Sequence, residues 1–364
     1  MTEHRRYQYE PLRRMTEEVF RRFGYTDEES WIIADVLLTS DLMGIESHGV
    51  QRLVLYPYGI SIGRIKLKAP LTVVKETPLS VVLDAGAGMG QIAGYRAMKM
   101  AIEKAKKTGY GMALVRNSNH YGIAGYYSMM AAKEGLLGMS MTNTQALVVP
   151  TFGRQPLLGT NPIAVTMPAS PTFFHLDMST SVVTAGKMEV YAKNKEPLPA
   201  GWAVDEMGSV NTSAQVFVKN RGTGLGGLLP LGGAGEKMSG HKGYGLSVLV
   251  ELMTGVLSGG VTSNFVRAKN DVEACCHVFT AMDYGMLTED KSALEAHFSE
   301  YLETLRSSQT QDGEARIYTH GEKETEHMTR ALREGVPIGE ATLAEIKRVC
   351  QERGINGDEY LIEA

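Results

Sequence analysis

The sequence predicts an α/β protein whose two ends are helical. From about residue 71 onward, short apolar runs typical of strands alternate with helical patterns. Before that point, and again after about residue 290, apolar residues recur at the three- and four-residue spacing of helices. The 364 residues, 43% of them hydrophobic, are enough to build two domains or one elaborated domain.

Two helices are predicted at the N-terminal end. Apolar residues between positions 12 and 23 recur at helical spacing, and Gly24 then supplies a stop. Thr26 and Glu29 have the spacing of a capping box, in which each side chain accepts a hydrogen bond from the backbone N–H of the other residue. We therefore expect a second helix that begins after Thr26 and ends at Gly44.

The remaining elements follow in order along the chain. Strands are predicted at residues 81–83, 112–115, 137–141, 163–167 and 173–176, with helices at 95–107 and up to about 134. Residues 194–240, rich in Gly, Pro, Asn and Ser, indicate a long irregular excursion. Further helices are predicted at 246–257, 294–305, 325–333 and 343–350. We therefore expect a helical part at 1–70, an α/β domain at 71–235 and a helical part at 236–364 that packs with the N-terminal part.

Composition excludes several classes of partner. The 37 Lys and Arg residues against 41 Asp and Glu give a net charge of −4, and no basic block is interleaved with aromatic residues, so nucleic acid is not an expected partner. No apolar run reaches the ~18 residues of a membrane span, and the first 14 residues lack a signal-peptide core. The three cysteines form no disulfide framework or zinc-ligand pattern. We expect a cytoplasmic protein without a metal site or membrane partner.

Two glycine-rich stretches match a dinucleotide-binding fingerprint in spacing only. Gly88-x-Gly90-x-x-Ala93 lies between a predicted strand and a predicted helix, but no acidic residue ends a second strand about 20 residues later. Residues 222–227 repeat the glycine spacing without a strand before them or a helix after them. A plain strand-to-helix turn accounts for the first stretch, and a flexible loop accounts for the second.

Ser47, His48 and Arg52 follow the stop of the second helix. If Ser47 caps a new helix, His48 and Arg52 lie four residues apart on one face. Imidazole exchanges protons near neutral pH, and a guanidinium binds a carboxylate with two parallel hydrogen bonds. These residue types suit a substrate with a carboxylate next to a hydroxyl or carbonyl group, although an exposed helix face without chemistry would also accommodate them.

Other candidate residues lie in loops and at predicted helix starts. His120 is in a polar loop after a predicted strand, a common place for catalytic groups in α/β enzymes. Thr160 and Asn161 are in a turn between apolar segments. Asp177 lies where a strand is predicted to lead into a helix whose free amides suit a phosphate or ribose, and Lys242 begins an apolar helix. Ordinary turns and N-caps use the same residue types.

The order of these motifs resembles the type-2 malate/L-lactate dehydrogenase family, which includes ureidoglycolate, sulfolactate and 2,3-diketo-L-gulonate oxidoreductases. The resemblance extends over nearly the whole chain. Its motifs are Gly44-x-x-Ser47-His48-Gly49-x-x-Arg52, Asn119-His120-x-Gly122, Gly159-Thr160-Asn161-Pro162, Asp177-Met178-Ser179-Thr180-Ser181, Gly201-Trp202-Ala203-Val204-Asp205, Gly240-His241-Lys242-Gly243-Tyr244-Gly245 and Gly321-Glu322-Lys323-Glu324. Residues 208–228 lack the Thr-x-Asp-Pro pattern of the family, which puts the conformation of that loop in doubt.

The resemblance implies a fold and an assembly. Members of the family bind NAD(P) without a Rossmann domain, on a largely antiparallel sheet, and form homodimers with shared active sites. By this resemblance, residues 71–235 are a non-Rossmann NAD(P)-binding domain with a largely antiparallel mixed sheet. The two chain ends then form a helical domain for catalysis and dimerisation. The incomplete fingerprint at Gly88 agrees with that fold.

The resemblance also implies roles for site residues. His48 matches a general acid/base with Ser47 and Arg52 beside it, and His120 matches a histidine with the same role in ureidoglycolate-type members, so both are candidates. The implied substrate contacts are Arg52, His120, Thr160 and Asn161. The implied cofactor contacts are Thr144, Asp177, Met178, Ser179, Lys242, Gly243, Gly321, Glu322 and Lys323.

The predicted function is that of an oxidoreductase which uses NAD or NADP to interconvert a small 2-hydroxy acid and its 2-oxo acid, of malate or L-lactate type. Arg52 holds the substrate carboxylate, and His48 or His120 moves the hydroxyl proton. One alternative is a ureidoglycolate, sulfolactate or imino-acid oxidoreductase of the same family. Another is a non-catalytic binding protein on this fold.

Overall fold

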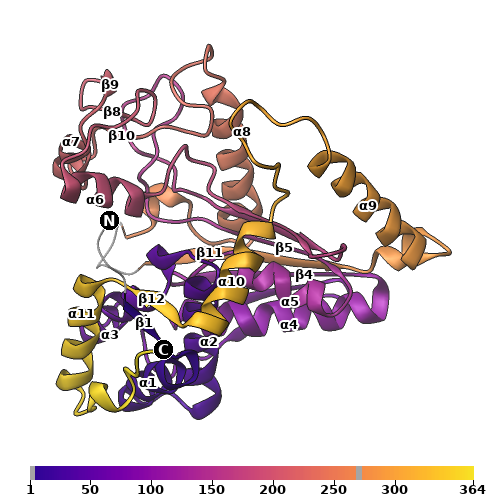
Figure 1. The fold of residues 1–364 in the computed structure, drawn as a ribbon, viewed down its shortest axis with the longest axis horizontal. Coiled ribbons are helices and arrows are strands. Elements are labelled where there is room, and N and C mark those ends of the chain that lie inside the picture. The colour runs from indigo at the N-terminus through magenta and orange to yellow at the C-terminus, as the bar shows by residue number, and fades with distance from the viewer. Residues whose placement is uncertain (1–4, 268–272) are drawn as a thin grey trace.

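A mixed β-sheet forms the centre of the molecule in the computed structural model, which describes residues 5–267 and 273–364 (Figure 1). Within these residues the sheet contains seven strands in the spatial order β2-β3-β4-β11-β5-β6-β7. Their bounds are β2 (Thr72–Glu76), β3 (Ser80–Asp84), β4 (Tyr110–Ser118), β5 (Leu137–Thr142), β6 (Ile163–Met167), β7 (Phe174–Met178) and β11 (Cys275–Met282). Strands β3 and β4 run parallel, and the other neighbouring pairs run antiparallel. The expected largely antiparallel mixed sheet is confirmed.

Strand β11 lies between β4 and β5, although it belongs to residues 236–364, for which the sequence predicted helices. All of its residues except Met282 are buried. A strand that is covered on both faces shows a continuous buried run instead of an alternating pattern, and such a run cannot be distinguished from a buried helix by its period. For this reason no strand was predicted at this position.

Helices cover both faces of the sheet (Figure 1). Helices α4 (Gly90–Thr108) and α5 (Gly125–Lys133) pack on one face, and α8 (Gly240–Glu251) with the π-helical turn after it (Leu252–Val256) packs on the other. Side chains alternate between the faces along β4. Val115 therefore belongs to the core under α4, and its neighbour Leu114 belongs to the core that includes Val250 of α8.

The two ends of the chain form one helical unit (Figure 1). One hydrophobic core contains Leu12 and Leu37 from the first segment together with Val336 and Ile346 from the last. The terminal strands pair antiparallel, which ties the ends together. The elements of this unit are β1 (Arg5–Tyr7), α1 (Tyr9–Phe23), α2 (Asp27–Leu42), α3 (Leu55–Ser61), α10 (Glu322–Glu334), β12 (Val336–Ile338) and α11 (Glu340–Glu352). The expected helical unit built from both chain ends is confirmed.

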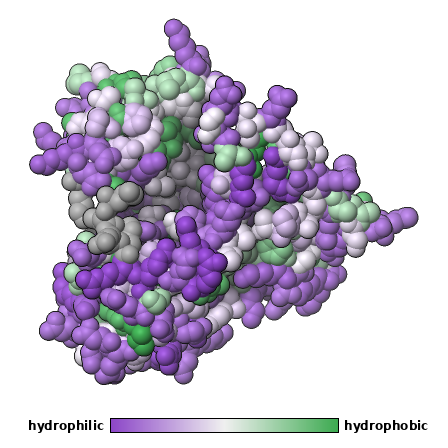
Figure 2. Space-filling view, viewed as in Figure 1, coloured by the Kyte–Doolittle hydropathy of each residue, from purple (hydrophilic) through white to green (hydrophobic). Residues whose placement is uncertain are grey.

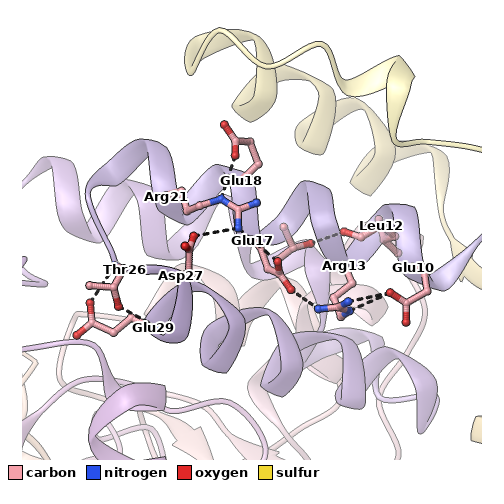
Figure 3. A network of polar contacts seen from close by, with 10 residues as sticks. Glu10, Leu12, Arg13, Glu17, Glu18, Arg21, Thr26, Asp27 and Glu29 are labelled. Atoms are coloured by element: carbon pink, nitrogen blue, oxygen red, sulfur yellow. Dashed lines mark hydrogen bonds and ion pairs between the residues drawn. The ribbon is translucent and has the colours of Figure 1, made fainter.

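Caps and ion pairs define the junction between α1 and α2 (Figure 3). Helix α1 ends at Gly24, which has the left-handed φ of +99° that glycine adopts without strain. Thr26 Oγ1 accepts a hydrogen bond from the Glu29 N–H at 3.2 Å, and the Glu29 carboxylate accepts one from the Thr26 N–H at 3.2 Å. This is the predicted capping box. Arg21 also reaches across to Asp27 at 3.4 Å, although so exposed a pair adds little stability.

Residues 194–240 form a packed unit instead of the irregular excursion that their composition indicated. A second sheet has the order β10-β8-β9, and a core that includes Met188, Phe217 and Leu228 supports it. Because each of these strands has only two residues, no alternating pattern could reveal them. The elements are α6 (Ala185–Asn194), β8 (Ala203–Val204), β9 (Val210–Asn211), α7 (Ala214–Asn220) and β10 (Gly227–Leu228).

Helix α9 (Lys291–Arg306) follows β11 and projects beyond the sheet (Figure 1). Its Phe298 packs edge-on against Phe174 of β7, with the ring centroids 5.8 Å apart. Helices α9, α10 and α11 lie where the sequence predicted the three helices of the tail. Among the helices that the structure describes, none is long and apolar enough to cross a membrane.

Candidate active site

Segments that are far apart in the sequence meet at one end of the central sheet. Strand β11 is antiparallel to both β4 and β5, so its first residues lie beside the last residues of those two strands, and Ser118 is opposite Cys275. The start of β6 and the end of β7 lie at the same end, because Ile163 pairs with Met178. The loops that follow β4, β5 and β7 and the loop that precedes β11 therefore converge.

A cavity of about 280 Å³ opens at this end of the sheet. The loop after α2, at residues 45–55, completes its wall from the side of the helical unit. The face shown in Figure 2 is hollowed between the two parts of the molecule. Of the predicted site residues, the wall contains Ser47, His48, Arg52, His120, Thr144, Thr160, Asp177, Met178 and Ser179.

Two imidazole rings lie together in the cavity wall. The rings of His48 and His120 stack with their centroids 5.4 Å apart and an interplanar angle of 27°. Nδ1 of His48 contacts the hydroxyl of Ser47 at 2.9 Å, and Nδ1 of His120 contacts the hydroxyl of Tyr56 at 2.7 Å. Within the described residues, neither Nε2 atom has a hydrogen-bond partner. Because Nδ1 of His120 also accepts a hydrogen bond from the Gly122 N–H at 3.3 Å, its neutral ring carries the proton on Nε2 and can donate it. The contact with Ser47, in contrast, leaves Nε2 of His48 able to accept a proton.

Burial keeps both rings uncharged at neutral pH. Desolvation, with a further contribution from the positive charge of Arg52, lowers the pKa of His48 to about 3. Desolvation also lowers the pKa of His120 well below its ordinary value, and the charges of His48 and Arg52 lower it further. Because each ring disfavours a proton on the other, the pair titrates as a unit. Neutral imidazole is the form that accepts a proton.

Arg52 is held so that its guanidinium tip remains available. Its Nε donates a hydrogen bond to the backbone carbonyl of Ser47 at 2.6 Å. In the part of the chain that the structure describes, its two Nη atoms have no hydrogen-bond or ion-pair partner. Two free Nη groups match the geometry of a carboxylate.

The local structure around Arg52 differs from the sequence prediction in one respect. His48 lies on one 3-10 turn (Glu46–His48) and Arg52 lies on the next (Val50–Leu53), so they are not on a single helix capped by Ser47. Gly49 separates the two turns, and its backbone lies against the carboxylate of Asp41. Asp41 Oδ2 accepts a hydrogen bond from the Val50 N–H at 2.8 Å, which anchors the loop to α2.

Thr144 and Asn161 are joined by a buried polar network. Asn161 does not line the cavity: it is fully buried, and its Nδ2 donates to Glu251 Oε1 at 2.8 Å. Its Oδ1 accepts from the Thr144 N–H at 3.3 Å, and Thr144 Oγ1 accepts from the Thr160 N–H at 3.1 Å. Asn161 thus supports the cavity wall from behind. Glu251 was not predicted, because nothing in its sequence context separates it from an ordinary helix residue.

Asp177 closes another side of the cavity. Its Oδ2 accepts a hydrogen bond from the Gly125 N–H at 2.7 Å, and burial raises its pKa to about 6. The predicted helix start at this position is wrong: β7 continues to Met178, and the next helix begins at Ala185 with Thr184 as its cap. Strand pairing with β6 takes precedence over the local capping signal.

The remaining predicted cofactor residues lie outside the cavity. Lys242 is exposed on the first turn of α8, and Gly243 lets that turn pack on the backbone of Leu231, which an added Cβ would approach to 2.3 Å. Gly321 packs against β7 in the same way, and Lys323 lies over a tyrosine ring. Glu322 accepts a hydrogen bond from Thr319 Oγ1 at 3.1 Å. The structure of the single chain does not bring these residues to His48 and His120.

Several polar residues at or behind the cavity wall were not predicted from the sequence. Tyr56 orients His120, and Gln145, Arg267 and Glu273 lie in the cavity wall. Arg267 and Glu273 precede β11, so their proximity to His120 depends on a strand that the sequence did not reveal. Tyr56 lies four residues after Arg52, and this helix-like spacing was the one signal that could have identified it.

The cavity fits one end of a nicotinamide cofactor together with a small acid. Apolar side chains such as Ile123 and Leu147 lie beside polar groups such as Thr144, a composition typical of ligand sites. Its volume is just below the roughly 300–1,000 Å³ of such sites. The cavity therefore suits a ring and a small acid, and a whole dinucleotide would extend beyond it.

Comparison with known proteins identifies the family of the chain. The model of the malate/L-lactate dehydrogenase family matches residues 7–347. The chain belongs to that family. It is thus an oxidoreductase that acts on the CH–OH group of a hydroxy acid. It is 44% identical to the malate dehydrogenase of Pyrococcus abyssi, over 93% of this chain and 92% of the relative.

Two further relatives share nearly the whole length. The L-sulfolactate dehydrogenase of Methanocaldococcus jannaschii is 32% identical, over 94% of this chain and 96% of the relative. The solved structure of the malate dehydrogenase of Pyrococcus horikoshii OT3 superimposes with a TM-score of 0.89 at 40% identity, covering 98% of this chain and all of that chain. The predicted family and fold class are confirmed.

Gly49→Ala is predicted to disturb the loop that carries His48. The new Cβ would lie 1.8 Å from Asp41 Oδ1, so the buried carboxylate or the loop must move, at a cost of about 1–3 kcal/mol in the free energy of unfolding. Chemical denaturation and activity measurements test this. Gly357→Ala is the control, because its Cβ would have no neighbour closer than 3.5 Å. Unchanged stability and activity in Gly49→Ala would contradict this description of the loop.

His48→Gln is predicted to reduce the acid sensitivity of the fold. The pKa of His48 is about 3 in the folded chain, so between pH 6.5 and about 3 the unfolded state binds the extra proton and stability falls as pH falls. Removing this group should lower the slope of unfolding free energy against pH by up to about 1.4 kcal/mol per unit in that window. Denaturant titrations from pH 7.5 to 4.5 measure the slope. Equal slopes in both proteins would show that the ring is not buried as described.

Proposed function

We propose that the protein is an NAD(P)-dependent dehydrogenase which interconverts malate, or a closely similar 2-hydroxy acid, and its 2-oxo acid. The observation that carries the proposal is the stacked pair of His48 and His120 beside the free Nη groups of Arg52 in one cavity. An acid/base next to a carboxylate-binding group is what this substrate class requires. The similarity to enzymes named malate dehydrogenase, at 44% and 40% identity, supports malate over lactate.

The proposed mechanism assigns one task to each group. Arg52 binds the C1 carboxylate with its Nη groups, which fixes the C2 hydroxyl near the imidazole pair. One imidazole Nε2 takes the hydroxyl proton while the C2–H bond breaks and its electron pair leaves as hydride, so that the C2–O bond becomes a carbonyl. The bound nicotinamide supplies the hydride acceptor in this direction and the hydride donor in the other. In reduction the same nitrogen returns the proton to the substrate oxygen.

The proposed cofactor contacts fall into two groups. Thr144, Asp177, Met178 and Ser179 line the cavity and would hold the nicotinamide end. The assignments of Lys242, Gly243, Gly321, Glu322 and Lys323 to the same cofactor depend on the family resemblance alone, because these residues lie outside the cavity. NAD and NADP both remain compatible with these contacts.

A substrate panel tests the proposal. Oxaloacetate, pyruvate, sulfopyruvate and a cyclic imino acid are each combined with NADH and with NADPH, and oxidation of the cofactor is followed at 340 nm. We expect the highest kcat/KM with oxaloacetate. Stabilisation of the fold by one of the two cofactors should accompany turnover, because a ligand that binds the folded state raises its stability. No turnover of any 2-oxo acid with either cofactor would overturn the proposal.

His48→Gln and His120→Gln are predicted to show non-additive losses. General acid/base catalysis is worth about 10²–10⁴ in rate, so the variant that lacks the proton-transferring ring should lose kcat by that factor. Because the stacked rings act as a unit, the double variant should be little slower than the slower single variant. Steady-state rates of the three variants test this and identify the proton-transferring ring. Losses that multiply, or retention of most activity in all three, would exclude the pair from proton transfer.

We also propose that the protein forms a homodimer through the outer face of α8. Large apolar side chains are exposed along this helix and the turn after it, namely Leu246, Val248, Leu249, Leu252, Val256 and Leu257. Soluble monomers seldom expose contiguous apolar patches of this kind. A second copy of the chain is the proposed occupant, because the family resemblance implies a homodimer.

Leu249→Glu combined with Leu252→Glu is predicted to convert the dimer to a monomer. Both side chains are more than 40% exposed in the single chain, so the charges leave its fold intact but desolvate unfavourably in an interface. Analytical ultracentrifugation measures the mass. Leu305→Glu on α9, where the leucine is 40% exposed, is the matched control and should remain dimeric. A monomeric wild-type protein would refute the dimer, and a dimeric double variant would exclude this face.

A further inference from the structure

A second arginine, Arg267, lines the cavity and comes from a part of the sequence far from the loop of Arg52. Arg267 precedes β11 in the sequence, and Arg52 comes from the 3-10 turn Val50–Leu53 after α2. The two guanidinium groups are therefore positioned by independent elements around one cavity. The proposed mechanism uses only Arg52, so Arg267 has no assigned task.

Two of the three nitrogens of the Arg267 guanidinium have hydrogen-bond or ion-pair partners, and the third has none among the described residues. Its Nη1 donates to Gln145 Oε1 at 2.9 Å, and its Nη2 forms an ion pair with Glu273 Oε1 at 2.8 Å. Its Nε is buried and, in the described part of the chain, has no hydrogen-bond partner. An arginine with a purely structural role usually has its buried N–H groups paired, since an unpaired buried donor is costly. The unpaired donor indicates that an acceptor is supplied by a ligand.

Two further observations place this group in the site. The positive charges of both Arg52 and Arg267 act on the ring of His120 and contribute to lowering its pKa, so both lie near the reacting position. Arg267 also has a left-handed φ of +60°, a conformation that residues other than glycine seldom adopt and that occurs preferentially at ligand clamps. Gln145 and Glu273, which hold the guanidinium, line the cavity as well.

We infer that Arg267 binds the second anionic group of the substrate and so selects 2-oxo and 2-hydroxy acids that carry a carboxylate or a sulfonate at the far end. This inference rests on the proposed function, in which Arg52 binds the C1 carboxylate. A substrate with an anion at each end spans two fixed guanidinium groups with the C2 oxygen near His120 between them. Pyruvate or lactate leaves Nε of Arg267 without an acceptor.

The test compares Arg267→Gln with the wild-type protein on four substrates. These are oxaloacetate, sulfopyruvate, pyruvate and the 4-amide of oxaloacetate, which has the same shape without the second charge. In the wild type we expect oxaloacetate or sulfopyruvate to exceed the amide in kcat/KM by about 10–100-fold, the value of one charged hydrogen-bonded contact. The ratio of oxaloacetate to sulfopyruvate distinguishes a carboxylate from a sulfonate as the preferred group.

Arg267→Gln should abolish this discrimination, with kcat/KM for the dianionic acids falling about 10–100-fold and that for pyruvate and the amide changing little. Arg154→Gln removes an equal charge from an exposed position outside the cavity and should preserve the discrimination. Equal losses on all four substrates, with an unchanged melting temperature, would give Arg267 a structural role and overturn the inference. An unchanged preference of Arg267→Gln for the dianionic acids would also overturn the inference. Turnover of 2-oxo acids by the wild-type protein would still support the proposed function in either case.

Discussion

The candidate active site depends on the position of one strand, β11, between β4 and β5. Its antiparallel register with both neighbours brings the loops after β4 and β5 to the segment that precedes β11. His120, Thr144 and Arg267 come from these three segments. They are far apart in the sequence, and the pairing of β11 with β4 and β5 brings them to one cavity. Sheet pairing fixes the ends of β4 and β5, from which the loops of His120 and Thr144 start, and this supports the rigidity that a preorganised site needs.

In the proposed mechanism, burial of the histidine pair sets the protonation state from which the reaction starts. Desolvation in the cavity wall and the nearby guanidinium keep both rings neutral, so the free protein is prepared to accept a proton from a hydroxyl group. A bound carboxylate would neutralise Arg52 and thereby remove part of the cost of protonating the ring. Substrate binding and acid/base strength are therefore coupled through the same guanidinium, because Arg52 contributes to lowering the pKa of both histidines.

The sequence predicted well what local patterns determine. The stop at Gly24, the capping box of Thr26 and Glu29, and the helices of the tail all depend on neighbouring residues, and the structure contains them. His48 and His120 were found separately, but their stacking arises from tertiary packing that no local pattern encodes. Strand β11 was not predicted because both of its faces are buried, and Asp177 lies in β7, which continues to Met178, where a helix start was predicted. Arg267 had no signal of its own, since its role follows from that strand.

The most direct test of the central claim is the fate of a labelled hydride. The reduced nicotinamide cofactor, deuterated at the transferring position of C4, is incubated with oxaloacetate and the protein in ordinary water, and the product is examined by mass spectrometry and proton NMR. If the cavity holds the nicotinamide and C2 beside the imidazole pair, one deuterium is found on C2 of a single enantiomer of malate and the hydroxyl proton comes from solvent. Malate without deuterium at C2, or with deuterium in both enantiomers, would contradict the account.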